Sequence, residues 1–179
     1  MLQASDRETA FEQLFAAHYR AVRAYVLRRS GPDAVEDVVA ETFLIAWRRL
    51  DSLGADPLPW LFGVARRVLA NQLRADRRRG ALSARLRTLG GGEPDPGWRP
   101  SPLMSPELAA AVASLSPRER EALLLVAWEG LASDRAARAA GCSPAAFRVR
   151  LHRARRRVAA QLADPSATDR RSPITGEAP

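Results

Sequence analysis

Lysine is absent from this chain of 179 residues, in which all 28 cationic side chains are arginine. This absence excludes Schiff-base chemistry and a Walker-type phosphate loop, because both depend on a lysine amine. A single cysteine excludes an intrachain disulfide, and with only two histidines it leaves no ordinary zinc site. Long apolar runs are also missing, since even the segment 122–128 falls far short of the roughly 20 residues that span a bilayer. We therefore expect no cofactor, no metal site and no membrane insertion.

Signals for export are missing as well. The N-terminus is polar and acidic and lacks the basic and apolar segments of a signal peptide. The single cysteine agrees with a reducing compartment. We expect the chain to be cytoplasmic.

The positive charge is concentrated in two stretches. The net charge is +8, while residues 51–80 carry an excess of three positive charges and residues 118–163 an excess of six. Two separated basic segments are typical of a protein that contacts a polyanion at two places. Composition alone leaves a second interpretation open, in which the arginines cover two solvated helix faces.

Residues 5–80 show the apolar spacing of α-helices. Three stripes recur every three to four residues, from Phe11 to Val26, from Val35 to Leu50 and from Leu61 to Leu73. The break at 30–32 and the loop at 51–59 separate these stripes. We expect one small helical domain.

A linker and a second domain follow. Residues 81–104 contain three consecutive glycines and four prolines, which predicts a flexible linker. Residues 105–163 are again helical in pattern, and Ser116 with Glu119 forms a capping-box sequence. The polar residues 164–179 predict a disordered tail. The predicted fold class is all-α, with two small helical domains joined by a flexible linker.

The second domain ends in a helix-turn-helix pattern. Ser133 is placed to cap a short helix through Ala140, Gly141 and Cys142 predict a tight turn, and a long helix follows. On that helix an apolar face should pack inward, and residues 143–157 hold six arginines without one acid. We expect the outward face to bind a DNA groove. The inward residues are Phe147, Leu151, Ala154 and Val158.

These motifs resemble the extracytoplasmic-function (ECF) sigma factors, the two-domain sigma factors of bacterial RNA polymerase. The resemblance covers roughly residues 8–163, and its most specific part is the helix-turn-helix, which is similar to the fourth-region unit that reads the minus-thirty-five promoter element. We predict that the DNA-binding residues of this helix are Ala146, Arg148, Val149, Arg150, His152, Arg153 and Arg156.

The segment from Asp37 to Trp47 is similar to the second-region helix that docks on the polymerase clamp. The family usually has glutamine where this chain has Ala40. The resemblance implies that the polymerase is bound by Asp37, Glu41, Phe43 and Trp47.

The segment Trp60 to Arg67 resembles the part of the family that melts and reads the minus-ten element. A basic helix beside a loop and aromatic residues can track a single strand and stack an unpaired base. The family commonly has asparagine at the position of Arg67. The predicted contacts are Trp60, Arg66, Arg67, Asn71 and Arg74.

The resemblance implies a promoter-specificity subunit and not an enzyme. Its partners would be the polymerase core and promoter DNA, with an anti-sigma factor as a further partner that the sequence leaves open, and the free chain would be monomeric. The alternative is a free-standing helix-turn-helix regulator, which the helical first half disfavours. A nuclease would need metal ligands, and Asp33, Glu36, Asp37 and Glu41 have no second segment to complete such a site. The promoter sequence and the inducing signal are not encoded in these patterns.

Overall fold

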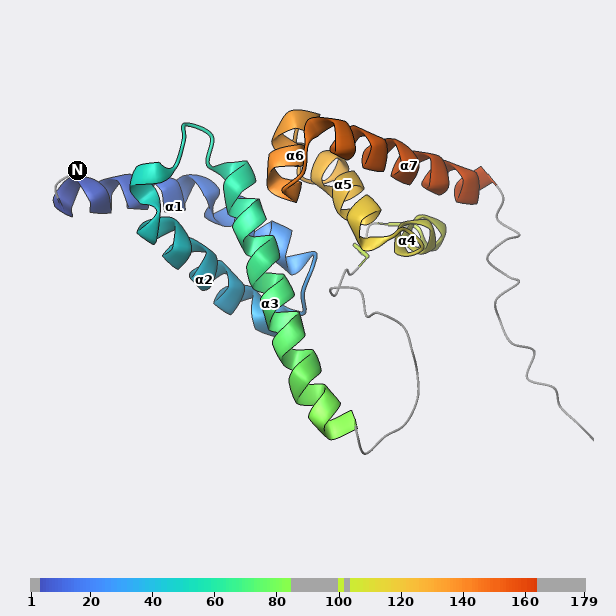
Figure 1. Cartoon of the computed structure of the whole chain (residues 1–179), viewed down its shortest axis with the longest axis horizontal. Coiled ribbons are helices and arrows are strands. Elements are labelled where there is room, and N and C mark those ends of the chain that lie inside the picture. The colour runs from blue at the N-terminus through green and yellow to red at the C-terminus, as the bar shows by residue number, and fades with distance from the viewer. Residues whose placement is uncertain (1–3, 85–99, 102–103, 164–179) are drawn as a thin grey trace, which may run out of the picture.

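The computed structural model of the chain describes residues 4–84, 100–101 and 104–163. Within these ranges the secondary structure is helical and contains no strand (Figure 1). Two short 3-10 helices, Pro32–Ala34 and Leu50–Ser52, flank the second α-helix. The α-helices are α1 (Ala4–Leu27), α2 (Val35–Arg48), α3 (Leu58–Ala84), α4 (Pro106–Ala113), α5 (Pro117–Ala127), α6 (Ser133–Ala140) and α7 (Pro144–Ala163).

The all-α prediction is confirmed, while two local boundaries differ. Helix α3 continues to Ala84 and so includes the first four residues of the predicted linker. Alanine, leucine and arginine favour helix in this segment more than Gly80 disfavours it. Ser133 is the first helical residue of α6 and not its cap, since Ala132 holds the N-cap position. The predicted tail and most of the predicted linker lie outside the described residues.

Helices α1, α2 and α3 pack around one core, and α4 to α7 form a second group (Figure 1). In the first group Tyr25 stacks on Phe62 with ring centroids 4.6 Å apart, and both side chains are buried. In the second group Phe147, Leu151 and Ala154 of α7 are buried, as the apolar spacing predicts. None of the described helices is long and apolar enough to cross a membrane.

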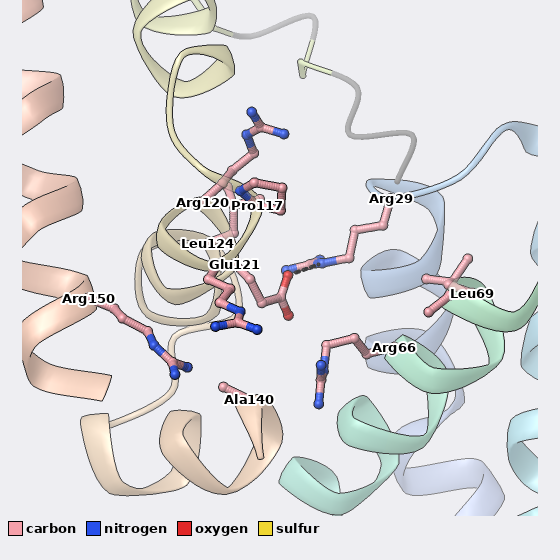
Figure 2. Close-up of a pocket in the computed structure, with 11 residues that line it drawn as sticks. Arg29, Arg66, Leu69, Pro117, Arg120, Glu121, Leu124, Ala140 and Arg150 are labelled. Atoms are coloured by element: carbon pink, nitrogen blue, oxygen red, sulfur yellow. Dashed lines mark hydrogen bonds and ion pairs between the residues drawn. The ribbon is translucent and has the colours of Figure 1, made fainter. Parts of the chain in front are cut away.

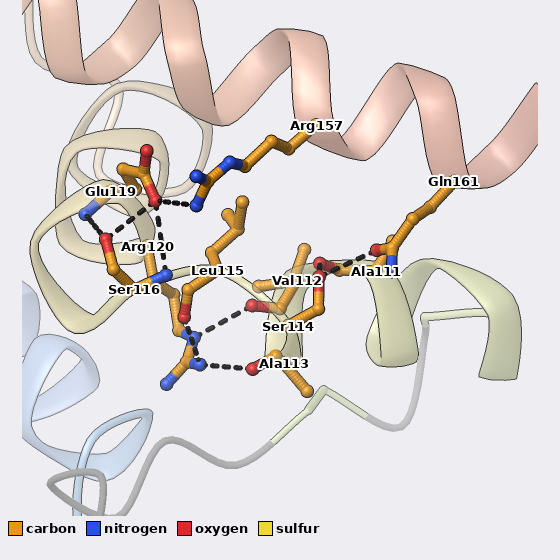
Figure 3. Close-up of polar contacts among 10 residues, drawn as sticks. All are labelled: Ala111, Val112, Ala113, Ser114, Leu115, Ser116, Glu119, Arg120, Arg157 and Gln161. Carbon is orange, nitrogen blue, oxygen red and sulfur yellow. Dashed lines mark hydrogen bonds and ion pairs between the residues drawn. The ribbon is translucent and has the colours of Figure 1, made fainter. Parts of the chain in front are cut away.

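The end of α4 is stabilised by a buried arginine from α5. The Arg120 guanidinium donates hydrogen bonds to the backbone oxygens of Val112, Ala113 and Leu115 at 2.9, 2.5 and 2.9 Å (Figure 3). These oxygens lie at the end of α4 and in the turn that follows, where a helix lacks a full set of backbone donors, so the arginine supplies hydrogen bonds to them. The Val112 oxygen also accepts from the backbone N–H of Leu115 at 3.3 Å. Burial lowers the pKa of Arg120. The side chain is therefore structural.

The two groups of helices touch along α3 and α6. Gly63 of α3 lies against the backbone of Ala139, and a Cβ atom at position 63 would stand 3.3 Å from the Ala139 carbonyl oxygen. This distance is tighter than most Cβ contacts, so glycine lets the two helices approach without a shift of the Ala139 backbone. Gly141, with φ of +65°, ends α6 in the left-handed conformation and opens the turn into α7.

A buried ion cluster joins the domains. Arg29, at the end of α1, donates to Glu121 Oε2 at 2.8 Å and to Glu129 Oε1 at 2.9 Å. Arg28 also pairs with Glu129, and the Tyr25 hydroxyl donates to Glu121 Oε1 at 2.8 Å. Burial alone would lower the pKa of Arg29, but the two carboxylates and Tyr25 outweigh it and raise the pKa. The cluster is thus a charge-balanced and largely buried contact between sequence segments about a hundred residues apart.

A second, more exposed contact joins the α2–α3 loop to α6. Asp56 accepts hydrogen bonds from Arg135 at 2.6 and 2.9 Å and from Arg138 at 2.6 Å. The hydrogen bond from Arg135 is the largest cause that lowers the pKa of Asp56. The loop before α3 is therefore held by the second domain.

We predict that Arg29→Gln separates the domains. The change removes the ion pair of Glu121 and one of the two ion pairs of Glu129, and breaking a buried pair in this way costs about 3 to 5 kcal/mol. Small-angle scattering should report a larger radius of gyration, with helix content by circular dichroism unchanged. Arg23→Gln, which removes an exposed pair with Glu36 inside the first domain, is the control and should leave the radius unchanged. An unchanged radius for Arg29→Gln would contradict the role of the cluster.

Candidate nucleic-acid interface

A polar cavity opens on the first domain beside Trp60. Its volume is about 450 Å³, and its walls come from α2, α3 and the loop between them. Trp60 is half-buried, while Arg67 and Asn71 are exposed at the rim. The lining residues are Glu41, Ile45, Arg49, Ser52, Trp60, Val64, Arg67, Val68 and Asn71.

Four of the five predicted single-strand contacts share this side of α3. Arg74 donates to Asn71 Oδ1 at 2.5 Å, so the amide at the rim is oriented by an arginine one turn further along. The positions of Trp60, Arg67, Asn71 and Arg74 differ by seven, four and three residues, which places them on one helix face. A cavity with an aromatic wall and a basic rim can hold an unpaired base next to its phosphate.

Arg66 does not belong to this group. Its side chain is half-buried and lines a second cavity, which lies between the domains (Figure 2). In this arrangement Arg66 and Arg67 line different cavities, and a DNA contact by Arg66 stays a prediction. Adjacent helix positions point about 100° apart, and only the packing partner shows which of the two remains exposed.

The outer face of α2 carries the residues that the sequence assigns to a polymerase contact. Asp37 and Glu41 are exposed one turn apart. Leu44 follows on the same face and is 49% exposed, which is unusual for a large apolar residue. The sequence assignment did not include Leu44, although its position opposite the buried stripe of α2 could have identified it.

Phe43 and Trp47 lie on the inner side of α2. Phe43 is only 3% exposed and packs at 4.7 Å between ring centroids against Phe15. Trp47 is half-buried, contacts Phe11 edge-on at 5.2 Å and lies under the Arg7 guanidinium. The ring of Phe43 is therefore part of the core in this structure, and its contact with polymerase stays a prediction. Trp47 keeps a partly accessible edge.

The outer face of α7 is strongly cationic. Arg148, His152, Arg153 and Arg156 are exposed, and none of them forms an ion pair with a described residue. Val149 is 50% exposed, and Ala146 is half-buried near the helix start.

The start of α7 is capped by its own residues. The backbone N–H of Ala146 donates to Ser143 Oγ at 3.2 Å. Ala146 leaves only a small side chain at this end of the helix, and its approach to a DNA groove stays a prediction.

One arginine of this helix is neutralised. Arg157 donates to Glu119 Oε2 at 2.7 Å, and the same oxygen accepts the Ser116 hydroxyl at 2.7 Å (Figure 3). The bond from Ser116 is the largest cause that lowers the pKa of Glu119. The predicted capping box of Ser116 and Glu119 is confirmed, and it also positions α7 on α5.

Arg150 occupies a different environment from its neighbours on α7. It is half-buried and lines the cavity between the domains, and Figure 2 shows it approaching from the side opposite to Arg66. Arg150 therefore lies against a cavity shared with the first domain, whereas Arg148 and Arg153 are exposed. Within the described residues, no group of three histidine, cysteine or acidic side chains is arranged to hold a metal ion.

Two family models match the chain. Residues 14–79 match Sigma-70 region 2, and residues 105–158 match Sigma-70 region 4. The first range contains the cavity beside Trp60 and the outer face of α2, and the second contains the helix-turn-helix.

The chain is also similar to curated proteins over most of its length. It is 32% identical over 154 residues to the ECF RNA polymerase sigma factor EcfG of Rhodopseudomonas palustris, covering 83% of each chain. It is 34% identical over 152 residues to the RNA polymerase sigma factor CarQ of Myxococcus xanthus, covering 82% of this chain and 85% of the relative.

Two solved structures share the fold. The sigma factor RpoE in complex with the anti-sigma factor NepR from Bartonella quintana has a TM-score of 0.63 and 27% identity, with 86% of this chain and 97% of that chain covered. CnrH in complex with the cytosolic domain of CnrY has a TM-score of 0.59 and 28% identity, with 88% and 90% covered.

We predict that truncation of Phe43 lowers the free energy of unfolding much more than truncation of Leu44, because Phe43 is buried in the core and Leu44 is exposed. Phe43→Ala is expected to lower the free energy of unfolding by about 3 to 5 kcal/mol. Leu44→Ala is expected to change it by less than about 1 kcal/mol. Urea unfolding followed by circular dichroism measures both. Equal losses would show that the burial assigned to the two neighbours is wrong.

Proposed function

The chain belongs to the ECF sigma factors of bacterial RNA polymerase, and on that premise we propose how its surfaces divide the work of promoter recognition. It is a sigma subunit that directs promoter-specific initiation by RNA polymerase, and its partners are the polymerase core and promoter DNA. The region 2 match over residues 14–79 argues against a free-standing helix-turn-helix regulator. In this proposal the polymerase catalyses RNA synthesis, and the chain itself is not an enzyme. The chain acts in the cytoplasm, where polymerase and promoter are found.

The polymerase contact is the outer face of α2. Asp37 and Glu41 supply two exposed carboxylates, and Leu44 supplies an exposed apolar group beside them. A small apolar centre flanked by charge is the usual composition of a protein-binding patch. Trp47 contributes only its accessible edge.

The minus-ten strand binds the cavity beside Trp60. A base that leaves the duplex would stack on Trp60, while Arg67 and Arg74 bind the phosphates that flank it. Asn71, held by Arg74, is the group best placed to hydrogen-bond a base edge. Arg67 replaces the usual asparagine of the family, so the charge at this rim differs from that of relatives.

The minus-thirty-five duplex binds α7. The observation that carries this assignment is the outer face of the helix, where exposed arginines have no acidic partner among the described residues. Arg148, Val149 and Arg153 would face the major groove beyond the small Ala146. His152 and Arg156 are proposed as phosphate contacts, and Arg150 joins the reading face once the domains part.

Binding both elements requires the domains to separate. The two elements lie about 25 base pairs apart, which is about 85 Å of duplex at roughly 3.4 Å per pair. In this structure Arg29 of the first domain touches Glu121 and Glu129 of the second. The 21 residues between α3 and α4 reach about 75 Å when extended. Because each domain adds its own width to this reach, the chain is long enough to contact both promoter elements at once. The contact form is therefore the free or inhibited state.

An anti-sigma factor is a further proposed partner. The solved structure of RpoE from Bartonella quintana holds a sigma factor with the anti-sigma factor NepR, and its likeness to this chain extends over both domains. The free chain is proposed to be a monomer.

We predict that charge reversal on α2 weakens polymerase binding. The double change Asp37→Lys and Glu41→Lys should reduce affinity for core polymerase about tenfold or more, because like charges then face the partner. The matched control is Glu8→Lys with Glu12→Lys, which reverses two exposed acids one turn apart on α1. Fluorescence titration with core polymerase measures both. Equal affinity of the two variants, or a loss of helix content in the first, would refute the assignment.

We predict that Trp60→Ala impairs strand opening. Loss of one stacking platform costs about 1 to 3 kcal/mol, or roughly 5- to 150-fold in open complexes. The readout is run-off transcription with core polymerase on promoters selected from genomic DNA, compared with binding to a premelted template. Trp128→Ala removes a 37% exposed tryptophan in the second domain and serves as control. Normal opening by Trp60→Ala would reject the cavity as the strand site.

A further inference from the structure

A second cavity lies between the two domains and is not used by the functions assigned above. Its volume is about 210 Å³, and its walls come from α1, α3, α5, the end of α6 and α7 (Figure 2). Leu69, Leu124 and Ala140 provide apolar wall surface. The cavity exists only while the domains are in contact, because neither domain supplies more than part of its wall.

Three arginines at this cavity have no counter-charge. Arg66 comes from the first domain, and Arg118 and Arg150 come from the second. None of the three forms a hydrogen bond or ion pair with any described residue. The Nε atom of Arg66 is buried and has no hydrogen-bond partner.

The one acid in the cavity wall is already engaged. Glu121 accepts from Arg29 through one carboxylate oxygen and from Tyr25 through the other. It therefore leaves the three arginines unneutralised. Guanidinium groups that converge in a partly enclosed space repel one another, and an unsatisfied buried donor costs further free energy.

We propose that this cavity binds a small molecule with adjacent phosphate groups. Guanidinium groups form short, charge-assisted and often bidentate hydrogen bonds to phosphate oxygens. Three arginines from two domains match a ligand with two or more negative charges better than a single carboxylate. The apolar wall leaves room for an uncharged part of the ligand.

Such a ligand would hold the domains together. It contacts Arg66 on one domain and Arg118 and Arg150 on the other, so it binds the docked arrangement and not the extended one. This consequence rests on the proposed need for separation during promoter binding. The ligand would also keep Arg150 away from DNA, which makes the cavity a site of negative regulation.

Calorimetric titration of the full chain with inorganic pyrophosphate at constant ionic strength tests the site. Arg118→Gln is the informative variant, because Arg118 is exposed and belongs to neither proposed DNA surface. It should weaken pyrophosphate binding about tenfold or more, and Arg118→Lys should restore part of the affinity. Arg155→Gln removes the same charge from an exposed position of α7 outside the cavity and should leave the affinity unchanged.

The remaining outcomes separate the sources of phosphate. If the site takes a free ligand, saturating pyrophosphate lowers duplex binding by the unmodified chain much more than by Arg118→Gln. Equal pyrophosphate affinity of Arg118→Gln and Arg155→Gln, or no binding by the unmodified chain, overturns the proposal. In that case the arginines serve only the DNA backbone. Transcription without pyrophosphate tests the sigma function separately, so failure of one does not imply failure of the other.

Discussion

The buried pairing of Arg29 with Glu121 and Glu129 is the contact on which this arrangement depends. Its side chains are almost withdrawn from water, with 7% exposure for Arg29 and 3% for Glu129. Charges at such depth are tolerated only when they are balanced and hydrogen-bonded, and here the Tyr25 ring also covers the guanidinium at 3.7 Å. The contact is therefore stable only while both partners are present, because a competitor that binds one partner leaves the other buried without a counter-charge. A conditional contact suits the proposal that the domains separate to bind promoter DNA.

Docking also links the two proposed DNA-binding surfaces. Asp56 belongs to the loop that leads into Trp60 and its cavity, and it is held by Arg135 and Arg138 of the helix-turn-helix. Under the proposed function, release of the second domain would free this loop at the same time as it uncovers Arg150. Separation of the domains would then change both surfaces together, without a signal passing through either core.

Much of the local structure follows from the order of residues. Helical spacing, the Ser116 cap and the turn at Gly141 are properties of short segments, so they could be predicted before any long-range contact was known. The inward face of α7 was predicted for the same reason, because Phe147 and Leu151 recur at the helical period. The match to sigma regions follows from the same motifs.

By itself, then, the sequence determined which segments are helical, the Ser116 cap of α5, the apolar face of α7 and the family to which the chain belongs. Only the tertiary structure decided which polar side chains are free. Arg66 and Arg67 are neighbours in sequence, yet one lines the interdomain cavity and the other the cavity beside Trp60. The side chain of Phe43 is buried in the core. Arg120 donates to the backbone oxygens at the end of α4, whereas Arg150 forms no ion pair with a described residue. The physical reason is range: periodicity reflects contacts within a few residues, whereas the partner of a charged group is set by helices packed from distant parts of the chain.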